Sequence, residues 1–115
     1  MRHVIQVPSL RPEGYPYASY QRIFDTDRMA MSLVTVRPGA AVPEHEHVDE
    51  EQVYYVLRGR GVVALGDTRH PVGTGSAVYI PLGTRHGVTN ESQTEPFEYL
   101  YVVAFLRPEK EGSTG

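Results

Sequence analysis

The chain has 115 residues, of which 40% are hydrophobic and 22% charged, and its formal net charge is −3. This length fits one compact domain with a modest core and leaves no room for a second domain. The chain has no cysteine, which excludes disulfides, thiolate ligands and thiol nucleophiles, and its single lysine and lack of a basic cluster argue against nucleic-acid binding.

No apolar run approaches the ~18 residues that a membrane span needs, and the first residues lack the apolar core of a secretory signal. The absence of cysteine is compatible with a reducing compartment. We therefore expect a cytoplasmic protein without a membrane anchor.

Short strand-like segments, separated by glycine and proline turns, run through the whole chain. A long amphipathic helical pattern is missing. Many short antiparallel strands with such turns are typical of an all-β sandwich or barrel. The pattern predicts strands over residues 28–37, 52–58, 62–65, 76–80, 86–89 and 97–106.

The same pattern suggests how the chain is divided. We expect residues 1–27 to form an N-terminal arm with the first strand or strands, residues 28–107 to form the barrel, and residues 108–115 to form a disordered tail. Residues 8–20 hold three prolines and three tyrosines. They predict an irregular stretch that lies over the barrel or onto a second subunit.

Alternation sorts the side chains of two of these strands into faces. Met29, Met31 and Leu33 share one face of an early strand, and we expect them in the core. Tyr99 and Tyr101 share a face of the last strand, and the pattern leaves open whether that face is internal.

Two segments bounded by glycine and proline carry histidines at fixed offsets. The first reads Gly39-x5-His45-x-His47-x4-Gln52-x6-Gly59, and the second reads Gly75-x5-Pro81-x-Gly83-x2-His86-x3-Asn90. Alternate residues of a strand point to the same face, so His45 and His47 present two imidazoles side by side. With a further donor at Gln52 and a third histidine, His86, on a separate strand, they predict a metal site divided between two β-hairpins. Such ligands suit divalent Fe, Mn, Co, Ni, Cu or Zn and do not choose among these ions.

These segments resemble the two motifs of the cupins, a family built on a small β-barrel. The second segment matches at every defining position, and the first departs only where Gln52 stands in place of the usual glutamate. The short spacer, residues 60–74, is similar to that of small microbial single-domain cupins. The resemblance implies a jelly-roll barrel, the double-stranded β-helix, with His45, His47 and His86 as metal ligands and Gln52 as the fourth. It also implies a homodimer, since cupins commonly pair and small barrels need covered sheet edges.

The glutamine at position 52 changes the charge of the predicted site. A glutamate would bring a negative charge to the ion, whereas the Gln52 amide offers only its carbonyl oxygen. We therefore expect weaker metal retention but a stronger Lewis acid. Of the two preceding acids, Glu51 would face away from Gln52 along a strand. Glu50 lies further back in the expected turn and is the alternative fourth ligand.

Tyr54 shares the face of Gln52 and should point into the barrel. Its hydroxyl makes it our candidate catalytic residue, as a hydrogen-bond donor to the substrate or as an acid. The alternative is a packing residue with a satisfied hydroxyl. The residues expected at the surface, without a role in the site, are Arg58, Arg60, Arg85, His3 and His70.

Cupin barrels carry unrelated chemistries, so the fold alone does not set the reaction. We expect a metal-dependent enzyme that acts on a small oxygenated metabolite by redox-neutral Lewis-acid and acid–base chemistry, of the isomerase, ketonising, cyclase or lyase type. The set of three histidines and a glutamine resembles that of small cupins that ketonise unsaturated uronates. The alternatives are an Fe-type dioxygenase of an enediol or diketone, and a non-catalytic cupin that binds a metal or a small ligand.

Overall fold

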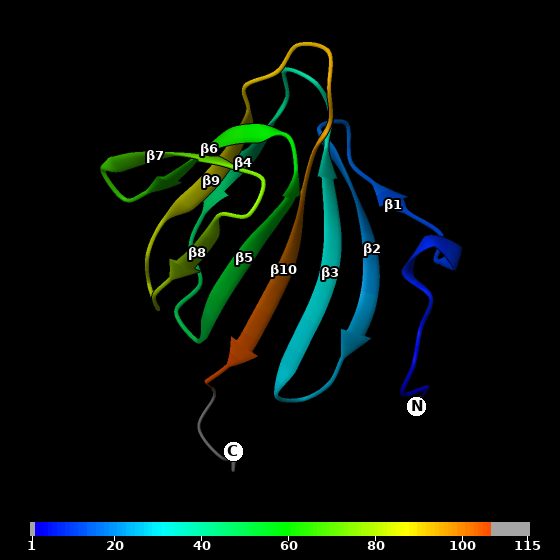
Figure 1. The fold of residues 1–115 in the computed structure, drawn as a ribbon. Coiled ribbons are helices and arrows are strands. Elements are labelled where there is room, and N and C mark those ends of the chain that lie inside the picture. The colour runs from blue at the N-terminus through cyan, green and yellow to red at the C-terminus, as the bar shows by residue number, and fades with distance from the viewer. Residues whose placement is uncertain (1, 107–115) are drawn as a thin grey trace.

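The computed structural model describes residues 2–106 of the chain. Figure 1 shows strands that curve toward each other in two sheets. No helix in this described part is long and apolar enough to cross a membrane. The elements are η1, a 3-10 helix (Val7–Ser9), β1 (Glu13–Gly14), β2 (Ala18–Asp25), β3 (Met29–Val36), β4 (Ala41–His45), β5 (Glu50–Arg58), β6 (Arg60–Leu65), β7 (Thr68–Gly73), β8 (Ala77–Ile80), β9 (His86–Asn90) and β10 (Phe97–Phe105).

The strands divide between a six-stranded sheet, in the order β1-β2-β3-β10-β5-β8, and a four-stranded sheet, in the order β4-β9-β6-β7. Neighbouring strands in both sheets are antiparallel. From β3 to β6, and again from β8 to β10, the chain crosses from one sheet to the other at each step. This alternation is that of a double-stranded β-helix, so the predicted all-β jelly-roll barrel is confirmed.

The core lies between the two sheets, and alternation along β5 shows how it forms. Gln52, Tyr54 and Val56 are buried, whereas Val53 and Tyr55 are exposed. Burying one large apolar side chain contributes about 1.5–3 kcal/mol. The large apolar side chains that are fully buried are Phe97, Ile80, Val34, Val36, Val56, Val63 and Val88.

The central position of β10 decides which face of the last strand is internal. β10 pairs with β3 on one side and with β5 on the other. Tyr99 and Val103 are buried and Tyr101 is partly buried. Leu100 and Val102 therefore lie on the outer side of the sheet.

The expectation that the early methionine face belongs to the core is wrong. Ala30 and Ser32 line the internal cavity, so the alternate residues Met29, Met31 and Leu33 lie on the outer face of β3. The small side chains inside leave room for the cavity, and the larger ones lie outside.

The segment of residues 8–20 is more regular than expected. It contains β1 and the start of β2, which pair as neighbours at the edge of the six-stranded sheet. The Gln21 amide fixes the preceding chain, because its Nε2 donates to the carbonyls of Val7 at 3.1 Å and Leu10 at 3.0 Å. The tail expected at residues 108–115 lies outside the described residues.

Candidate metal centre

The three motif histidines lie together at one end of the four-stranded sheet. β4 ends at His45 and β9 begins at His86, and the two residues are register partners. His47 follows in the loop between β4 and β5. One ring nitrogen from each histidine lies within 4.8 Å of the others. The predicted clustering of these three side chains is therefore present.

Backbone carbonyls orient two of the rings. The Nδ1 atom of His45 lies 2.9 Å from the Pro43 oxygen, and that of His86 lies 2.8 Å from the Thr84 oxygen. A carbonyl only accepts, so each Nδ1 carries the proton and the neutral ring keeps its lone pair on Nε2. Metal-binding histidines are commonly held in this way, by a second hydrogen bond from the other ring nitrogen.

The Nε2 atom of His86 is the strongest sign that a group is bound here. His86 is 1% exposed, and this nitrogen has no hydrogen-bond partner in the described structure. Burial lowers the pKa of His86 below its ordinary value; the Thr84 carbonyl opposes the shift, and His45 and His47 add to it. A neutral, buried acceptor without a partner costs about 1–3 kcal/mol. A divalent transition metal would satisfy it, and three imidazole nitrogens fit such an ion.

Three polar side chains on the inner face of β5 extend the cluster into the barrel. Glu50 Oε1 lies 3.7 Å from His47 Nε2. The same oxygen accepts a hydrogen bond from Gln52 Nε2 at 2.9 Å, and Gln52 Oε1 accepts one from the Tyr54 hydroxyl at 3.3 Å. We expected Glu50 to lie in a turn, but it is the first residue of β5. Its carboxylate links the histidines to Gln52.

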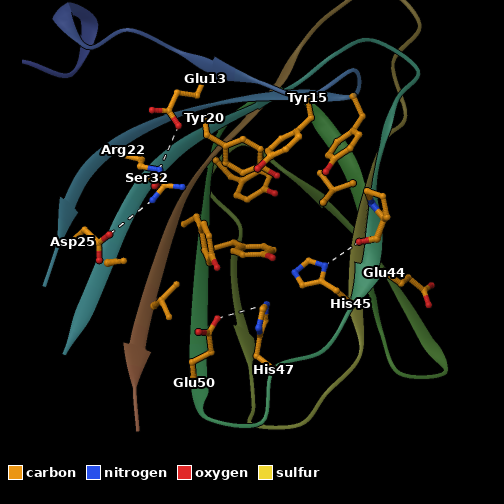
Figure 2. Close-up of a pocket in the computed structure, with 18 of the residues that line it drawn as sticks. Glu13, Tyr15, Tyr20, Arg22, Asp25, Ser32, Glu44, His45, His47 and Glu50 are labelled. Atoms are coloured by element: carbon orange, nitrogen blue, oxygen red, sulfur yellow. Dashed lines mark hydrogen bonds and ion pairs between the residues drawn. The ribbon is translucent and has the colours of Figure 1, made fainter. Parts of the chain in front are cut away.

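A cavity of about 670 Å³ lies beside the histidines. Figure 2 shows His45, His47 and Glu50 on one side of it and Tyr15 and Tyr20 near its upper edge. This volume is in the range of small-molecule sites. The cavity is lined by six of the tyrosines, Tyr15, Tyr17, Tyr20, Tyr54, Tyr99 and Tyr101.

The predicted site residues divide into two groups around this cavity. His45, His47 and Tyr54 line it. His86 and Gln52 are buried and are not among its lining residues. Burial raises the pKa of Tyr54 well above its usual range, so its hydroxyl is protonated at neutral pH. It can donate a hydrogen bond and does not act as an anion.

The sequence pattern did not identify the tyrosines of the N-terminal segment as part of the cavity. Tyr15, Tyr17 and Tyr20 reach it because β1 and β2 extend the six-stranded sheet over the barrel opening. Three tyrosines within six residues were a signal for such a wall. The surface residues predicted to lie outside the site do so: His70 is exposed on β7, and Arg85 forms an ion pair with Glu44 at 3.3 Å.

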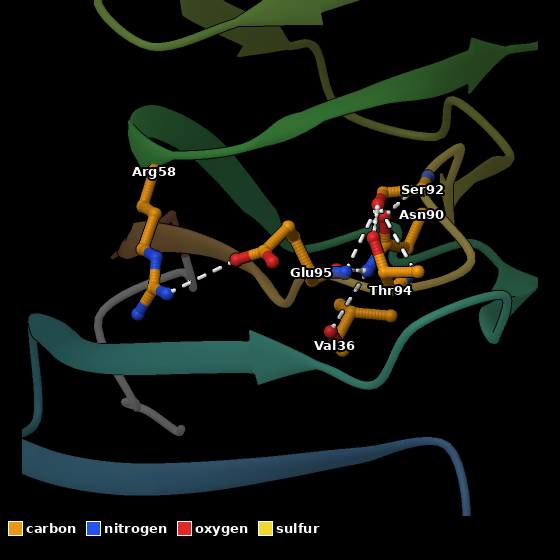
Figure 3. A network of polar contacts seen from close by, with 6 residues as sticks. All are labelled: Val36, Arg58, Asn90, Ser92, Thr94 and Glu95. Atoms are coloured by element: carbon orange, nitrogen blue, oxygen red, sulfur yellow. Dashed lines mark hydrogen bonds and ion pairs between the residues drawn. The ribbon is translucent and has the colours of Figure 1, made fainter.

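Asn90, the last residue of the second motif, has a structural role. It is 2% exposed, and its Nδ2 donates to the carbonyls of Val36, Arg37 and Glu95 at 2.8–3.2 Å. Its Oδ1 accepts from the Ser92 backbone at 2.9 Å. Figure 3 shows this network, which fastens the loop after β9 to the end of β3.

Comparisons with known proteins place the chain in a family. Residues 32–103 match the family model described as a cupin domain. Because this match covers more than half of the chain, the protein belongs to the cupin family, as the two motifs predicted. The chain carries a small cupin domain with a histidine cluster that fits a metal site.

Three similar proteins indicate the range of the family. The chain is 38% identical over 65 residues to protein SchB of Streptomyces halstedii, covering 56% of this chain and 47% of SchB. It is 32% identical over 69 residues to the oxalate-binding protein of Thermotoga maritima, covering 60% of this chain and 56% of that protein. The chain thus spans about half the length of these two relatives. The structure of KdgF from Halomonas sp. superposes with a TM-score of 0.82 at 18% identity, covering 96% of this chain and 99% of KdgF. At that identity the likeness shows the fold alone.

Proposed function

We propose that this cupin is a metal-dependent enzyme that acts on a small oxygenated molecule by redox-neutral chemistry, of the isomerase, ketonising, cyclase or lyase type. The observation that carries the proposal is the buried, unpartnered Nε2 of His86, which lies beside His45 and His47 at the edge of a cavity of substrate size. The clustered ring nitrogens and the open cavity together supply a place for an ion and for a molecule that contacts it.

In this proposal His45, His47 and His86 hold the ion, and the Gln52 carbonyl is the fourth ligand. When bound, a divalent ion would polarise a carbonyl or enol oxygen of the substrate. Glu50 is the alternative fourth ligand, supported by its distance of 3.7 Å from His47. The hydrogen bond from Gln52 Nε2 to Glu50 turns the amide oxygen away from that carboxylate.

We assign to Tyr54 the role of a hydrogen-bond donor to the substrate. Its hydroxyl lines the cavity and donates to Gln52, so a substrate oxygen in the cavity can take over that hydrogen bond. Glu50 also lines the cavity and has a carboxylate that can accept a proton from the substrate. Glu50 can therefore take a proton from one carbon or oxygen of the substrate and return it to another, which restores the carboxylate and leaves the oxidation state of the substrate unchanged.

Metal content is the first test. Protein purified without chelators should hold about one divalent transition-metal ion per chain, and His47→Ala and His86→Ala should lose it. His70→Ala is the matched control, because His70 is exposed on β7 and contacts only the Thr68 hydroxyl among the bonds described. Protein that fails to take up Ni²⁺, Zn²⁺, Mn²⁺ or Fe²⁺ would end the catalytic proposal.

Oxygen uptake separates the proposed reaction from the alternative of a dioxygenase. The redox-neutral reaction consumes no O₂ when the metal-loaded protein turns over enediol, diketone or unsaturated uronate candidates. Stoichiometric O₂ consumption by the Fe²⁺-loaded protein would favour the dioxygenase instead. A non-catalytic binding role is supported by the oxalate-binding relative. Binding without turnover of any candidate would favour that role.

We also propose a cytoplasmic homodimer. Apolar side chains gather on the outer face of β3 and β5, where Met29, Val53, Tyr55 and Leu57 are 41–46% exposed. A second copy would cover this face. Val53→Glu should convert the dimer to a monomer in light scattering. Val48→Glu, at a loop valine that is 78% exposed, should not. A monomeric wild-type protein would refute the dimer.

A further inference from the structure

The tyrosines of the cavity form two groups that face a common space. Tyr15 lies 5.6 Å from Tyr17 in a stacked arrangement and 5.6 Å from Tyr20 edge-on. Deeper in the barrel, Tyr54 lies 4.5 Å from Tyr99 and 5.7 Å from Tyr101. Tyr15 is exposed, while Tyr54 and Tyr99 are buried, so the aromatic wall extends from the opening to the interior.

The buried and half-buried hydroxyls of this wall are neutral at neutral pH. Burial raises the pKa of Tyr20 to about 12 and that of Tyr99 and Tyr101 above their usual range. Neutral phenols offer ring faces and edges for stacking and hydroxyls for hydrogen bonds. They carry no charge, so they do not act as ion-pair partners for an anion.

Arginines match two of the four negative charges around the cavity. Four of the lining residues are acids: Glu13, Asp25, Glu44 and Glu50. Arg22, the one arginine or lysine among the described residues that line the cavity, contacts Glu13 at 3.6 Å and Asp25 at 3.8 Å. Arg85, which does not line the cavity, forms an ion pair with Glu44. A divalent ion at the histidines would balance the two negative charges that remain.

With that ion bound, the described lining residues hold no unpaired arginine or lysine that could grip a carboxylate in the body of the cavity. A cationic ligand would be repelled by the bound ion. A neutral ligand needs no cationic partner and is not repelled by the bound ion. The aromatic wall favours a neutral ligand with flat rings. The cavity of about 670 Å³ is also far larger than a two-carbon acid requires.

We infer that the cavity takes a neutral, flat molecule of roughly two or three fused aromatic rings, with adjacent phenol or ketone oxygens that reach the histidines. This inference rests on the proposed function, since the oxygens are those that contact the ion. It separates this chain's substrate from small dicarboxylates and from uronates, which carry a negative charge.

Calorimetric titration of the full chain tests the inference. The probes are 2,3-dihydroxynaphthalene, a neutral diol with two fused rings, and the anions oxalate and galacturonate. Zn²⁺-loaded protein should bind the diol at least about tenfold more tightly than either anion. Metal-free protein should still bind the diol, more weakly, because the rings keep their contacts with the wall. Tighter binding of oxalate or galacturonate, or no binding of the diol, overturns the inference.

Substitutions in the wall show whether the rings are responsible. Tyr101→Leu and Tyr20→Leu should each weaken diol binding about tenfold, and Tyr101→Phe, which keeps the ring, should retain most of it. Tyr79→Leu is the matched control, because Tyr79 is exposed on β8 outside the cavity. All four variants should keep their Zn²⁺. Unchanged diol binding in both leucine variants overturns the inference, whereas loss of Zn²⁺ uptake by the wild type contradicts the proposed function instead.

Discussion

Gln52 donates a hydrogen bond from its amide nitrogen to the Glu50 carboxylate at 2.9 Å, so the two candidate fourth ligands contact each other directly. The pair lies on the inner face of β5, next to His47. This contact explains why a neutral glutamine, and not a glutamate, suits position 52. A carboxylate in place of Gln52 would face the Glu50 carboxylate at hydrogen-bond distance, and the repulsion would be relieved only by a cation or a proton.

Two substitutions of Gln52 should therefore change the Zn²⁺ affinity in opposite directions, and a substitution of Glu50 should change it little. Gln52→Glu should tighten Zn²⁺ binding by about tenfold or more, because the ion would then separate two carboxylates, and Gln52→Leu should weaken it by a similar factor. Glu50→Gln should change affinity by less than about threefold if Gln52 is the ligand. Competition titrations with a chromophoric chelator measure all three. A larger loss in Glu50→Gln than in Gln52→Leu would assign the fourth position to Glu50.

The Asn90 network predicts a large effect on stability far from the reaction. Asn90→Ala should lower the free energy of unfolding by about 3 kcal/mol, because it leaves the carbonyls of Val36 and Glu95 without their buried donor. Denaturant titration measures the change. Thr94→Ala is the control: its exposed hydroxyl contacts only the Ser92 hydroxyl among the bonds described, and the expected change is below about 0.5 kcal/mol. Equal effects of the two substitutions would refute the structural role of Asn90.

Gly59 and Gly75 have nearly the same φ angle but different surroundings. Alanine at each position therefore separates the cost of backbone strain from the cost of a steric clash of the new Cβ. Gly59 has φ of +90° and Gly75 has φ of +91°. A Cβ at Gly59 would lie 2.6 Å from the Pro96 oxygen, whereas a Cβ at Gly75 would meet nothing within 4 Å. Gly75→Ala should cost about 1–2 kcal/mol from backbone strain alone. Gly59→Ala should cost at least about 1 kcal/mol more, as measured by denaturant unfolding. A smaller loss at Gly59 than at Gly75 would contradict this.

The pattern of turns and strand-like runs predicted most of the fold, and prolines hid part of it. Strands β3, β5, β6, β8, β9 and β10 fall close to their expected residues, because glycine, proline and polar turns bound short runs of residues that favour strands. The pattern missed β4 and β7, each of which contains a proline, Pro43 and Pro71. Both are edge strands of the four-stranded sheet, where a proline removes no needed ladder bond. Whether a strand lies at the edge of a sheet depends on how the whole chain is arranged, so the sequence of that strand alone does not predict it.

The histidine cluster was predictable from the spacing of the two motifs. The expectation that His45 and His47 share one strand is wrong, because β4 ends at His45 and His47 lies in the loop that follows. Glu50 was named as the alternative fourth ligand, but its place in β5 was not predictable, because it depends on pairing with Phe105, a partner distant in the sequence. The tyrosine wall was missed for a related reason. β1 and β2 lie over the barrel only because β2 pairs with β3 and Gln21 fastens the chain before them. Long-range pairing therefore decides which tyrosines line the cavity.

The neutral tyrosines predict a loss of stability in alkali. Burial raises the pKa of Tyr20 from its ordinary value of 10.0 to about 12, and Tyr17 and Tyr15 add to the shift. Burial also raises the pKa of Tyr54, Tyr99 and Tyr101. A group whose pKa is higher in the folded than in the unfolded chain stabilises the fold fully below the unfolded pKa. That contribution is then lost as the pH rises from about 10 toward the folded pKa.

Thermal unfolding at increasing pH should therefore show a constant melting temperature below pH about 9 and a steep fall above pH about 10, by about 4 °C or more for each kcal/mol lost. Tyr20→Phe keeps the ring but has no proton to lose, so its melting temperature should fall less between pH about 10 and about 12. Phenolate absorbance recorded in the same samples should rise with unfolding, because the buried hydroxyls ionise only when exposed. Ionisation of all the tyrosines near pH 10 in the folded protein, without unfolding, would show that the hydroxyls of the cavity are in contact with bulk water.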